Sequence, residues 1–376
     1  MKKLFYKCII LFLFLTIEIF AADTLVVKTI SSGCKYFQLK DTLVNVVIDL
    51  LEVDLRSGNV GLAMGISHDV LNKGGETVLD FVRRKREEGI NIVAAVNGDF
   101  FGDDPMQSQN SMIRNGEIIK GVKLDRSSIA ITSDKRPFIG KFPFEGTAII
   151  NEDTLSIDAI NSQDSTLSLA IFSSHWKGLF PLTSTGDNII IEMQTSLIPE
   201  LHYKCTDYRR VISNSDIELS ENQILLKSKR KIDLSEIEDT LEFVFKFKNA
   251  PSEIFTLIGG LPMLFREEQL PESYYGAEGM TIKRFLDKNP RTAIGYDKEK
   301  TKLFIAVIDG RQPNYSMGMS LVELAEFMHS MGCYDALNFD GGGSTTMTIM
   351  DELINSPSDF TGSRPVYNYF FITSRE

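Results

Sequence analysis

The 376-residue sequence has few of the residues that build disulfide frameworks and metal sites. It contains four cysteines and four histidines, and the histidines lie far apart, without the spacing of metal ligands. Beyond residue 21 only Cys34, Cys205 and Cys333 remain, which is an odd and sparse set. This set excludes a disulfide framework and a cysteine zinc site, and it leaves open one bridge or three buried thiols.

Long apolar runs are also scarce, since only one is present and it lies at the N-terminus. Three lysines precede the run "CIILFLFLTIEIF", and small residues follow it, which is the pattern of a signal peptide cleaved near Ala21 or Ala22. Glu18 interrupts the run and no cysteine follows directly, so we expect neither a membrane anchor nor a lipoprotein. We therefore predict a signal peptide over 1–21 and an exported, periplasmic or extracellular protein without stable membrane insertion.

Positive charge is limited, because 51 acidic residues outnumber 40 basic ones and give a formal net charge of −11. Cleavage of the signal peptide removes three lysines and one glutamate and leaves a net charge of about −13. An acidic surface repels nucleic acid and anionic membranes, so we expect no nucleic-acid partner. The sequence carries no signal for the oligomeric state.

No internal repeat, low-complexity tract or Pro/Ser-rich linker divides the remaining chain. Residues 24–66 and 111–260 contain short apolar or alternating segments separated by turn residues, which is typical of strands. We predict an α+β fold built on a mixed sheet, with a C-terminal βαβ unit and a β-rich middle section. One domain would span 22–376, with an inserted β-rich subdomain at about 140–255.

The last third of the chain predicts the βαβ unit, formed by a strand at 302–308, a helix at about 321–331 and a strand at 335–339. Ser320 and Glu323 fit the capping box of that helix. If both strands lie in one sheet, they are parallel and joined by a right-handed crossover. Their carboxyl ends then meet at one edge of the sheet.

Acidic residues stand at these strand ends. Asp309 follows the first strand in "VIDGRQP", and Asp340 follows the second in "NFDGGGS". A helix at about 77–88 precedes a further strand that ends at Asn97, so Asn97 and Asp99 can join the same edge, where ligands of such sheets gather. Paired carboxylates can act as acid and base, as nucleophile and stabiliser, or as metal ligands, and each Asp can also simply cap its turn.

Three consecutive glycines, Gly341, Gly342 and Gly343, follow Asp340. They permit positive φ and close approach of a ligand, and their N–H groups can form an anion nest. The motif is not a P-loop, because no lysine follows, and it lacks the G-x-S-x-G pattern of a nucleophile elbow. Three arginines lie beside glycine turns or at a strand start and predict phosphate binding, with ion pairing to carboxylates as the alternative: Arg291, Arg311 and Arg364.

Seven segments occur in a characteristic order from roughly residue 45 to the C-terminus. They are "AAVNGDFF", "IRNGEII", "LIGGLPMLF", "RTAIGYD", "FIAVIDGRQPNYSMGMSLVELAEFM", "YDALNFDGGGSTTM" and "INSPSDFTGSRPVYNYFFI". Together they resemble the phosphodiester glycosidase family. The sequence departs from the family at Asp99, where the family usually has glycine.

The resemblance implies a hydrolase that releases a sugar similar to N-acetylglucosamine from a phosphodiester on its C1. The polar residues that it assigns to the site are Asn97, Arg291, Thr292, Asp309, Arg311, Glu323, Asn338, Asp340, Ser344, Thr345, Arg364 and Asn368. A phosphate on C1 is already a fair leaving group, so we expect a carboxylate at the oxocarbenium-like carbon and cations or N–H groups at the phosphate. Asp340 is the first candidate for the carboxylate, with Asp309 as its partner and Asp99 as an additional carboxylate.

Two other functions fit the sequence. In a metal-dependent phosphodiesterase, Asp309, Asp340 and Asp99 would hold Ca²⁺ or Mg²⁺, and the attack would fall on phosphorus. A secreted glycan-binding protein without turnover is the second alternative. No cofactor is required by the sequence, a divalent cation is compatible with it, and a carbohydrate or sugar phosphate is the expected ligand. The two aspartate roles can be reversed, and retention or inversion depends on the separation of the carboxyl groups.

Overall fold

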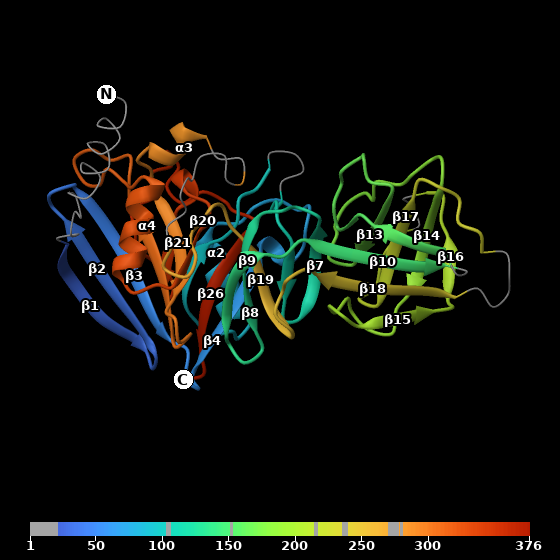
Figure 1. Ribbon diagram of the computed structural model, residues 1–376, viewed down its shortest axis with the longest axis horizontal. Coiled ribbons are helices and arrows are strands. Elements are labelled where there is room, and N and C mark those ends of the chain that lie inside the picture. Colours follow the sequence, from blue (N-terminus) through green and yellow to red (C-terminus); the bar gives the residue numbers. More distant parts are fainter. Residues whose placement is uncertain are drawn as a thin grey trace, which may run out of the picture.

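The computed structural model describes residues 22–102, 107–150, 153–213, 217–234, 240–269, 278 and 281–376, and the predicted signal peptide lies outside these ranges. The described residues contain 26 strands, arranged in four sheets, and three α-helices (Figure 1). The prediction of an α+β fold is therefore wrong, and the chain is mostly β. Both predicted helices form, but each spans ten residues and covers part of one sheet, whereas the short apolar runs elsewhere become strands.

The seven-stranded sheet combines the N-terminal strands with the last third of the chain. Its strands in spatial order are β1 (Asp23–Ser31), β2 (Cys34–Asp41), β3 (Val46–Asp54), β22 (Lys302–Ile308), β21 (Arg291–Tyr296), β23 (Asp335–Asn338) and β20 (Met263–Phe265). Both β22 and β23 pair antiparallel with β21, so they run parallel to each other and end at the same edge. The helix between them, α4 (Leu321–Ser330), packs on β20, β21 and β23, and its predicted capping box is confirmed.

The five-stranded sheet brings the strand that ends at Asn97 close to the C-terminal strand. Its strands in spatial order are β25 (Glu352–Leu353), β24 (Met347–Ile349), β5 (Ile92–Asn97), β26 (Asn368–Ser374) and β4 (Val60–Ile66). The helix α2 (Val78–Glu87) lies on this sheet, where Phe81 stacks on Tyr369 with ring centroids 4.1 Å apart. A Cβ at Gly65 would lie 2.2 Å from the Phe81 ring, so glycine is required for the helix to approach.

The middle of the chain forms the other two sheets, which extend to one side of the molecule (Figure 1). The four-stranded sheet contains β11 (Asp153–Ile157), β10 (Phe144–Ile150), β18 (Leu241–Phe247) and β15 (His202–Cys205). The ten-stranded sheet contains β16 (Tyr208–Arg210), β14 (Asp187–Glu192), β17 (Gln223–Ser228), β13 (Leu169–Ser173), β12 (Ala159–Ile160), β7 (Glu117–Val122), β6 (Met112–Arg114), β19 (Ile254–Gly259), β8 (Ser127–Thr132) and β9 (Pro137–Lys141). The inserted subdomain at about 140–255 stays a prediction, because the ten-stranded sheet runs across its expected border.

The apolar cores follow these layers. The largest core is shared by strands of three sheets, as Leu51, Met64 and Ile258 illustrate, and a separate core lies within the middle sheets. The cysteines Cys34, Cys205 and Cys333 are buried free thiols, in agreement with one of the two sequence interpretations. The third helix, α3 (Ile282–Leu286), is short, and none of the described helices is long and apolar enough to cross a membrane.

Candidate active site

The strand ends of β5 and β23 meet through the backbone of Asp340. The Asp340 amide donates to the carbonyl of Gly98 at 2.9 Å, and Asn97 Nδ2 donates to the carbonyl of Asp340 at 2.7 Å. Asn97 Oδ1 in turn accepts hydrogen bonds from Thr292 Oγ1 at 2.8 Å and from the Thr346 amide at 3.1 Å. Because Asn97 and Thr292 are buried and fully engaged, they position Asp340 rather than offer free groups to a ligand.

The glycine turn after Asp340 brings the main chain against two guanidinium groups. Gly342 has a φ of 62°, and a Cβ there would lie 3.0 Å from Arg311 Nη2. A Cβ at Gly343 would lie 2.7 Å from Arg364 Nη2. The positive φ thus favours glycine at position 342, whereas at position 343 the nearest atoms are the ends of the Arg364 and Asp359 side chains, which can shift. The turn continues into the 3-10 helix η4 (Gly342–Ser344). The guanidinium groups of Arg311 and Arg364 therefore pack against the main chain of this turn.

The third arginine, Arg291, is buried beneath the same turn. A Cβ at Gly341 would lie 3.8 Å from Arg291 Cδ. The guanidinium donates to the carbonyls of Met319 at 3.0 Å and Asp287 at 2.9 Å, and no ion pair joins it to a carboxylate of the described residues. Burial and then the charge of Arg311 lower the pKa of Arg291 to about 10. Arg291 therefore adds positive potential below the turn.

The other two arginines differ in their partners. Arg311, exposed and with a φ of 60°, donates through Nε and Nη2 to Asn289 Oδ1 at 3.0 and 2.8 Å. In the described part of the chain it has no carboxylate partner. Arg364 instead forms an ion pair with Asp359, with Nε 2.8 Å from Oδ2. Ion pairing, the alternative raised by the sequence, applies to Arg364, while Arg311 presents an unpaired cation.

The amides of the turn are largely occupied. Gly341 donates to the side chain of Asp340 at 2.9 Å, and Gly342 donates to the carbonyl of Pro290 at 2.9 Å. The amides of Ser344 and Thr345 close the short helix on the carbonyls of the turn itself. The guanidinium groups, rather than these four amides, are therefore available to an anion at this place.

Of the three predicted aspartates, Asp340 is the one whose side chain is partly exposed, whereas Asp99 and Asp309 are buried. Its carboxylate accepts a hydrogen bond from the amide of the next residue, Gly341, at 2.9 Å. Burial and, to a smaller extent, the charge of Asp99 raise the pKa of Asp340 to about 6 against the opposing effects of Ser344, Gly341 and Arg364. A carboxyl group that titrates near neutral pH can both accept and release a proton during turnover.

Asp99 lies close enough to influence Asp340 but is itself enclosed. Its Oδ2 accepts hydrogen bonds from Ser108 Oγ at 2.5 Å and from the Asn110 amide at 2.9 Å, and its Oδ1 accepts one from Asn110 Nδ2 at 3.3 Å. The Asp99 amide donates to Asn368 Oδ1 at 2.8 Å, which assigns Asn368 a structural contact. Since Asp99 is buried, it acts on Asp340 through its charge rather than by contact with a ligand.

The side chain of Asp309 makes no hydrogen bond to Asp340 in the described part of the chain, and its partners lie in another segment. It is buried and accepts hydrogen bonds from Asn355 Nδ2 at 2.9 Å and from the Ser356 amide at 3.0 Å. Asn355 Nδ2 also donates to the carbonyl of Thr345 at 3.2 Å. Asp309 therefore ties the segment after β25 to the end of the glycine turn, and burial raises its pKa.

The remaining predicted residues fall into two groups. Glu323 accepts from the Ser320 amide at 2.7 Å and pairs with Lys288 at 2.7 Å, so its carboxylate is engaged at the helix cap. By contrast, Asn338 Oδ1 and Thr345 Oγ1 are buried near the turn without a hydrogen-bond partner among the described residues, while Ser344 Oγ lies close enough to Asp340 to lower its pKa. Unsatisfied buried polar atoms are rare in folded proteins and gather at functional sites.

Some supporting residues were not foreseen. Ser108 and Asn110, which hold Asp99, lie in a loop that carried no sequence signal. Asn355, which holds Asp309, stands within "INSPSDF", one of the ordered segments, so its signal was present. In the described ranges, no group of three or more His, Cys, Asp or Glu side chains gathers as a metal-ligand set, and the three predicted aspartates each face different partners.

Comparison with known proteins bears on the identity of the chain. Residues 207–373 match the phosphodiester glycosidase family. The N-acetylglucosamine-1-phosphodiester alpha-N-acetylglucosaminidase of Bos taurus is 33% identical over 123 residues, which cover 32% of this chain and 23% of that protein. The Homo sapiens enzyme of the same name is 29% identical over 155 residues, covering 41% and 30%. The chain thus matches less than a third of the length of these relatives.

A solved structure extends the comparison to the fold. A hypothetical protein from Synechocystis superposes with a TM-score of 0.73 over 94% of this chain and 64% of that one, at 18% sequence identity. At this identity the likeness concerns the fold alone. The family match lies in the part of the chain that holds Asp340, the glycine turn and the three arginines, and over these residues the chain is similar to the phosphodiester glycosidase family.

Proposed function

We propose that the protein is an exported hydrolase that removes an N-acetylglucosamine-like sugar from a phosphodiester at C1. The observation that carries the proposal is the glycine turn after Asp340, whose main chain packs against Arg311 and Arg364 and which follows a carboxyl group with a pKa of about 6. The Bos taurus and Homo sapiens relatives are named for the same reaction, which supports the proposal. The predicted signal peptide supports export, which N-terminal sequencing of the mature protein would test.

In this proposal the phosphate binds at the arginines. Arg311 has no carboxylate partner in the described residues, so it can form a bidentate pair with phosphate oxygens without breaking an ion pair. Arg291 raises the positive potential from below, and Arg364 stands on the other side of the turn. Cations at this position stabilise the negative charge that grows on the phosphate as the C1–O bond breaks.

The sugar C1 then faces Asp340. The C1–O bond breaks with its electron pair leaving on the phosphate, and a water oxygen forms the new bond to C1. The products are the free sugar and a phosphate monoester. The ionised Asp340 stabilises positive charge at C1 or takes the proton of the incoming water, and burial, with a smaller contribution from the charge of Asp99, raises the pH at which it is ionised. Asp309 positions the turn through Asn355.

Hydrolysis of sugar-1-phosphodiesters in ¹⁸O-water tests this proposal. Attack at C1 places the label in the released sugar, whereas attack at phosphorus places it in the phosphate and overturns the proposal. A matched reaction with an EDTA-treated enzyme measures any metal requirement. The absence of sugar release from every α-linked sugar-1-phosphodiester in the panel, with a correctly folded protein, would also overturn it.

A further inference from the structure

A cavity of about 480 Å³ lies beside β7 and β12, two neighbouring strands in the middle of the ten-stranded sheet. It is lined by the end of β7 and the residues that follow it, and by the segment from Asp158 to Ser168. Its volume falls in the range of small-molecule sites. None of the residues proposed for the hydrolytic reaction lines it, so it requires a separate account.

Lys120 is the unusual side chain in this cavity. Only 5% of it is exposed, and its ammonium group donates to the carbonyl of Ser108. An ammonium group has three N–H donors, and the described residues give Lys120 this one acceptor and no carboxylate within ion-pair distance. Asp99 attracts it from farther away, but its own oxygens are occupied by Ser108 and Asn110. A buried cation with unused donors is costly unless something pairs with it.

The other charged groups of the cavity have partners, although Asp164 keeps its negative charge. Lys123 pairs with Asp158 at 3.1 Å. Asp164 accepts hydrogen bonds from the Thr166 amide at 2.8 Å and from Thr166 Oγ1 at 2.7 Å, which closes its own turn. Of the two lysines that line the cavity, Lys120 is therefore the one without a carboxylate within ion-pair distance in the described residues.

The uncharged lining matches a carbohydrate. Gln109 and Ser162 supply an amide and a hydroxyl, which can serve sugar hydroxyls as donors and acceptors. Leu124 and Leu167 supply apolar surface for the C–H face of a ring. Neither feature alone selects a charged ligand, so the selection falls to Lys120.

We propose that this cavity binds a hydroxyl-rich ligand with one anionic group, a carboxylate or a phosphate, which pairs with Lys120. Sugar acids and sugar phosphates share this chemistry. In a protein with a net charge of −11, a local unpaired cation is required to draw an anionic ligand to the surface. Binding at this site does not depend on the hydrolytic function proposed above.

Protection of Lys120 from amine acetylation tests the site in the wild-type protein. Burial lowers the pKa of Lys120 to about 8, so about half of its amine is unprotonated at pH 8, and peptide mass spectrometry measures its acetylation at high reagent concentration. Glucuronate and glucose 6-phosphate at saturation should each reduce acetylation of Lys120 about tenfold, while inorganic phosphate protects less and glucose does not. The exposed Lys246 on β18 is the internal control and should not change.

Three results of the labelling experiment would overturn the proposal. They are protection by glucose equal to that by the anionic sugars, protection by phosphate equal to that by glucose 6-phosphate, and no protection by either anionic sugar. A stronger effect of glucuronate identifies a carboxylate as the preferred group, and a stronger effect of glucose 6-phosphate identifies a phosphate.

A pair of lysine variants separates Lys120 from general charge effects. Lys120→Met keeps the length of the side chain and removes its charge, so calorimetric affinity for the protecting sugar should fall about tenfold or more. Lys123→Met removes the neighbouring lysine, which is already paired, and should change the affinity less than about twofold. Equal losses in both variants would overturn the role of Lys120. Asp340→Asn should bind as the wild type does, so failure here and failure of the proposed hydrolysis are distinguishable.

Discussion

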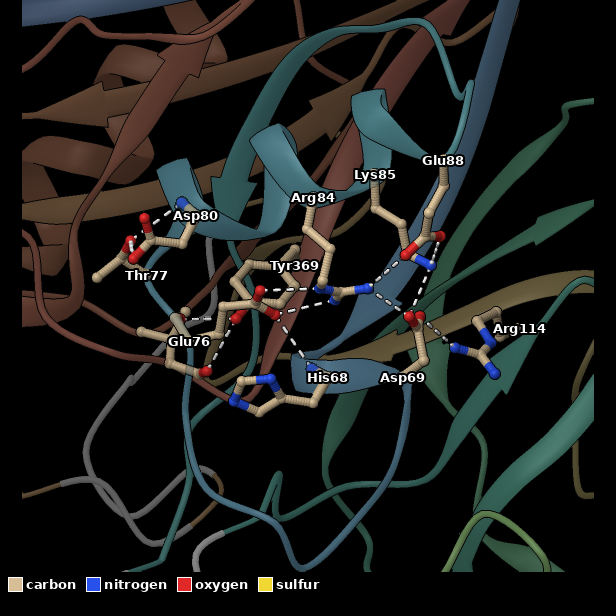
Figure 2. A network of polar contacts seen from close by, with 11 residues as sticks. His68, Asp69, Glu76, Thr77, Asp80, Arg84, Lys85, Glu88, Arg114 and Tyr369 are labelled. Atoms are coloured by element: carbon tan, nitrogen blue, oxygen red, sulfur yellow. Dashed lines mark hydrogen bonds and ion pairs between the residues drawn. The ribbon is translucent and has the colours of Figure 1, made fainter.

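Two polar clusters of the molecule differ in how completely their charges are paired. The first, shown in Figure 2, joins the loop after β4 to α2 and β6, and its three acidic and three basic side chains pair with one another: Asp69, Glu76, Glu88, Arg84, Lys85 and Arg114. The second surrounds Asp340, where Arg291 and Arg311 have no carboxylate partner in the described residues. The first cluster is closed, and the second is open to an anion.

The two aspartates at the centres of these clusters show the consequence. Burial opposes ionisation of Asp69, but Lys85 and Arg84 outweigh it, and its pKa is lowered. Burial and the charge of Asp99 raise the pKa of Asp340 to about 6. The closed cluster also holds His68 and Asp69 at positive φ values of 52° and 61°, a conformation that is costly for residues other than glycine. Complete pairing is thus typical of a structural role, and incomplete pairing of a site that binds.

The replacement Asp340→Asn should give the largest difference in activity between a variant of the open cluster and one of the closed cluster. We expect kcat for a sugar-1-phosphodiester to fall by about 10³-fold, because the amide cannot supply the negative charge or the proton acceptor. The melting temperature should not decrease. The matched control is Asp69→Asn, which should retain kcat within about twofold because Asp69 pairs with cations of the closed cluster. Equal losses of activity in the two variants would remove the distinction between the clusters.

The replacement Arg311→Met tests the open cluster from its cationic side. Loss of a bidentate phosphate contact should lower kcat/KM by about 30-fold, with little effect on stability, since the only described partner of this guanidinium is Asn289. Steady-state kinetics and thermal unfolding measure the two effects. Arg114→Met in the closed cluster is the control and should show the opposite pattern. An unchanged kcat/KM in Arg311→Met would argue against phosphate binding at the turn.

Asp69→Asn should weaken the closed cluster by about 2 kcal/mol in the free energy of unfolding, because three cations lose a charged acceptor. Urea unfolding monitored by fluorescence measures this change. A loss below about 0.5 kcal/mol would place the network among exposed ion pairs that contribute little. The variant Asp54→Asn, which removes an exposed pair with Arg56, is the matched comparison and should change stability by less than that amount.

The sequence predicted which residues belong to the open cluster better than it predicted the contacts among them. Asp340 and the glycines were found because an acidic residue and three glycines at a strand end are unusual, and the ordered segments added the arginines. The pairing of Asp309 with Asp340 was expected from their common edge, but strand ends do not determine side-chain direction, and Asp309 contacts Asn355 instead. The sequence did not predict the closed cluster, because its members come from separate segments and charged surface residues follow no regular spacing along the chain.

The fold class was missed for a related reason. The helices over 78–87 and 321–330 have clear signals at their starts, and both form. The amount of strand depends on pairing between distant segments, such as β3 with β22 and β4 with β26, which no local pattern reveals. The short apolar runs in the first and middle parts of the chain therefore form strands that contain more residues than the helices do.

The pH dependence of activity should depend on Asp99. If the ionised Asp340 is the active form, kcat/KM falls below about pH 6, where this carboxyl group becomes protonated. Asp99→Asn removes a negative charge that raises the pKa of Asp340, so the acid limb should move to lower pH by up to about one unit. The pH profile of kcat/KM measures the shift. A shift to higher pH would contradict the electrostatic role of Asp99.

The smallest expected effect is a stability difference of opposite sign between the clusters. The raised pKa of Asp340 means that its charged form is disfavoured by folding, so the cost in stability is small at pH 4, grows as the pH rises toward 6 and is complete above about pH 6. Asp340→Asn should therefore stabilise the protein at pH 8 by about 1 kcal/mol and change its stability little at pH 4, the partial exposure of the side chain limiting the gain.

The lowered pKa of Asp69 gives the reverse, because its charged form stabilises the fold above its unfolded pKa and this contribution is lost as the pH falls through its folded pKa. Asp69→Asn should thus destabilise the protein at pH 8 and progressively less toward acid. Urea unfolding at pH 8 and pH 4 compares the two variants directly. If Asp340→Asn destabilised the protein at pH 8 as Asp69→Asn does, Asp340 would belong to a closed network as well, and the contrast between the clusters would fail.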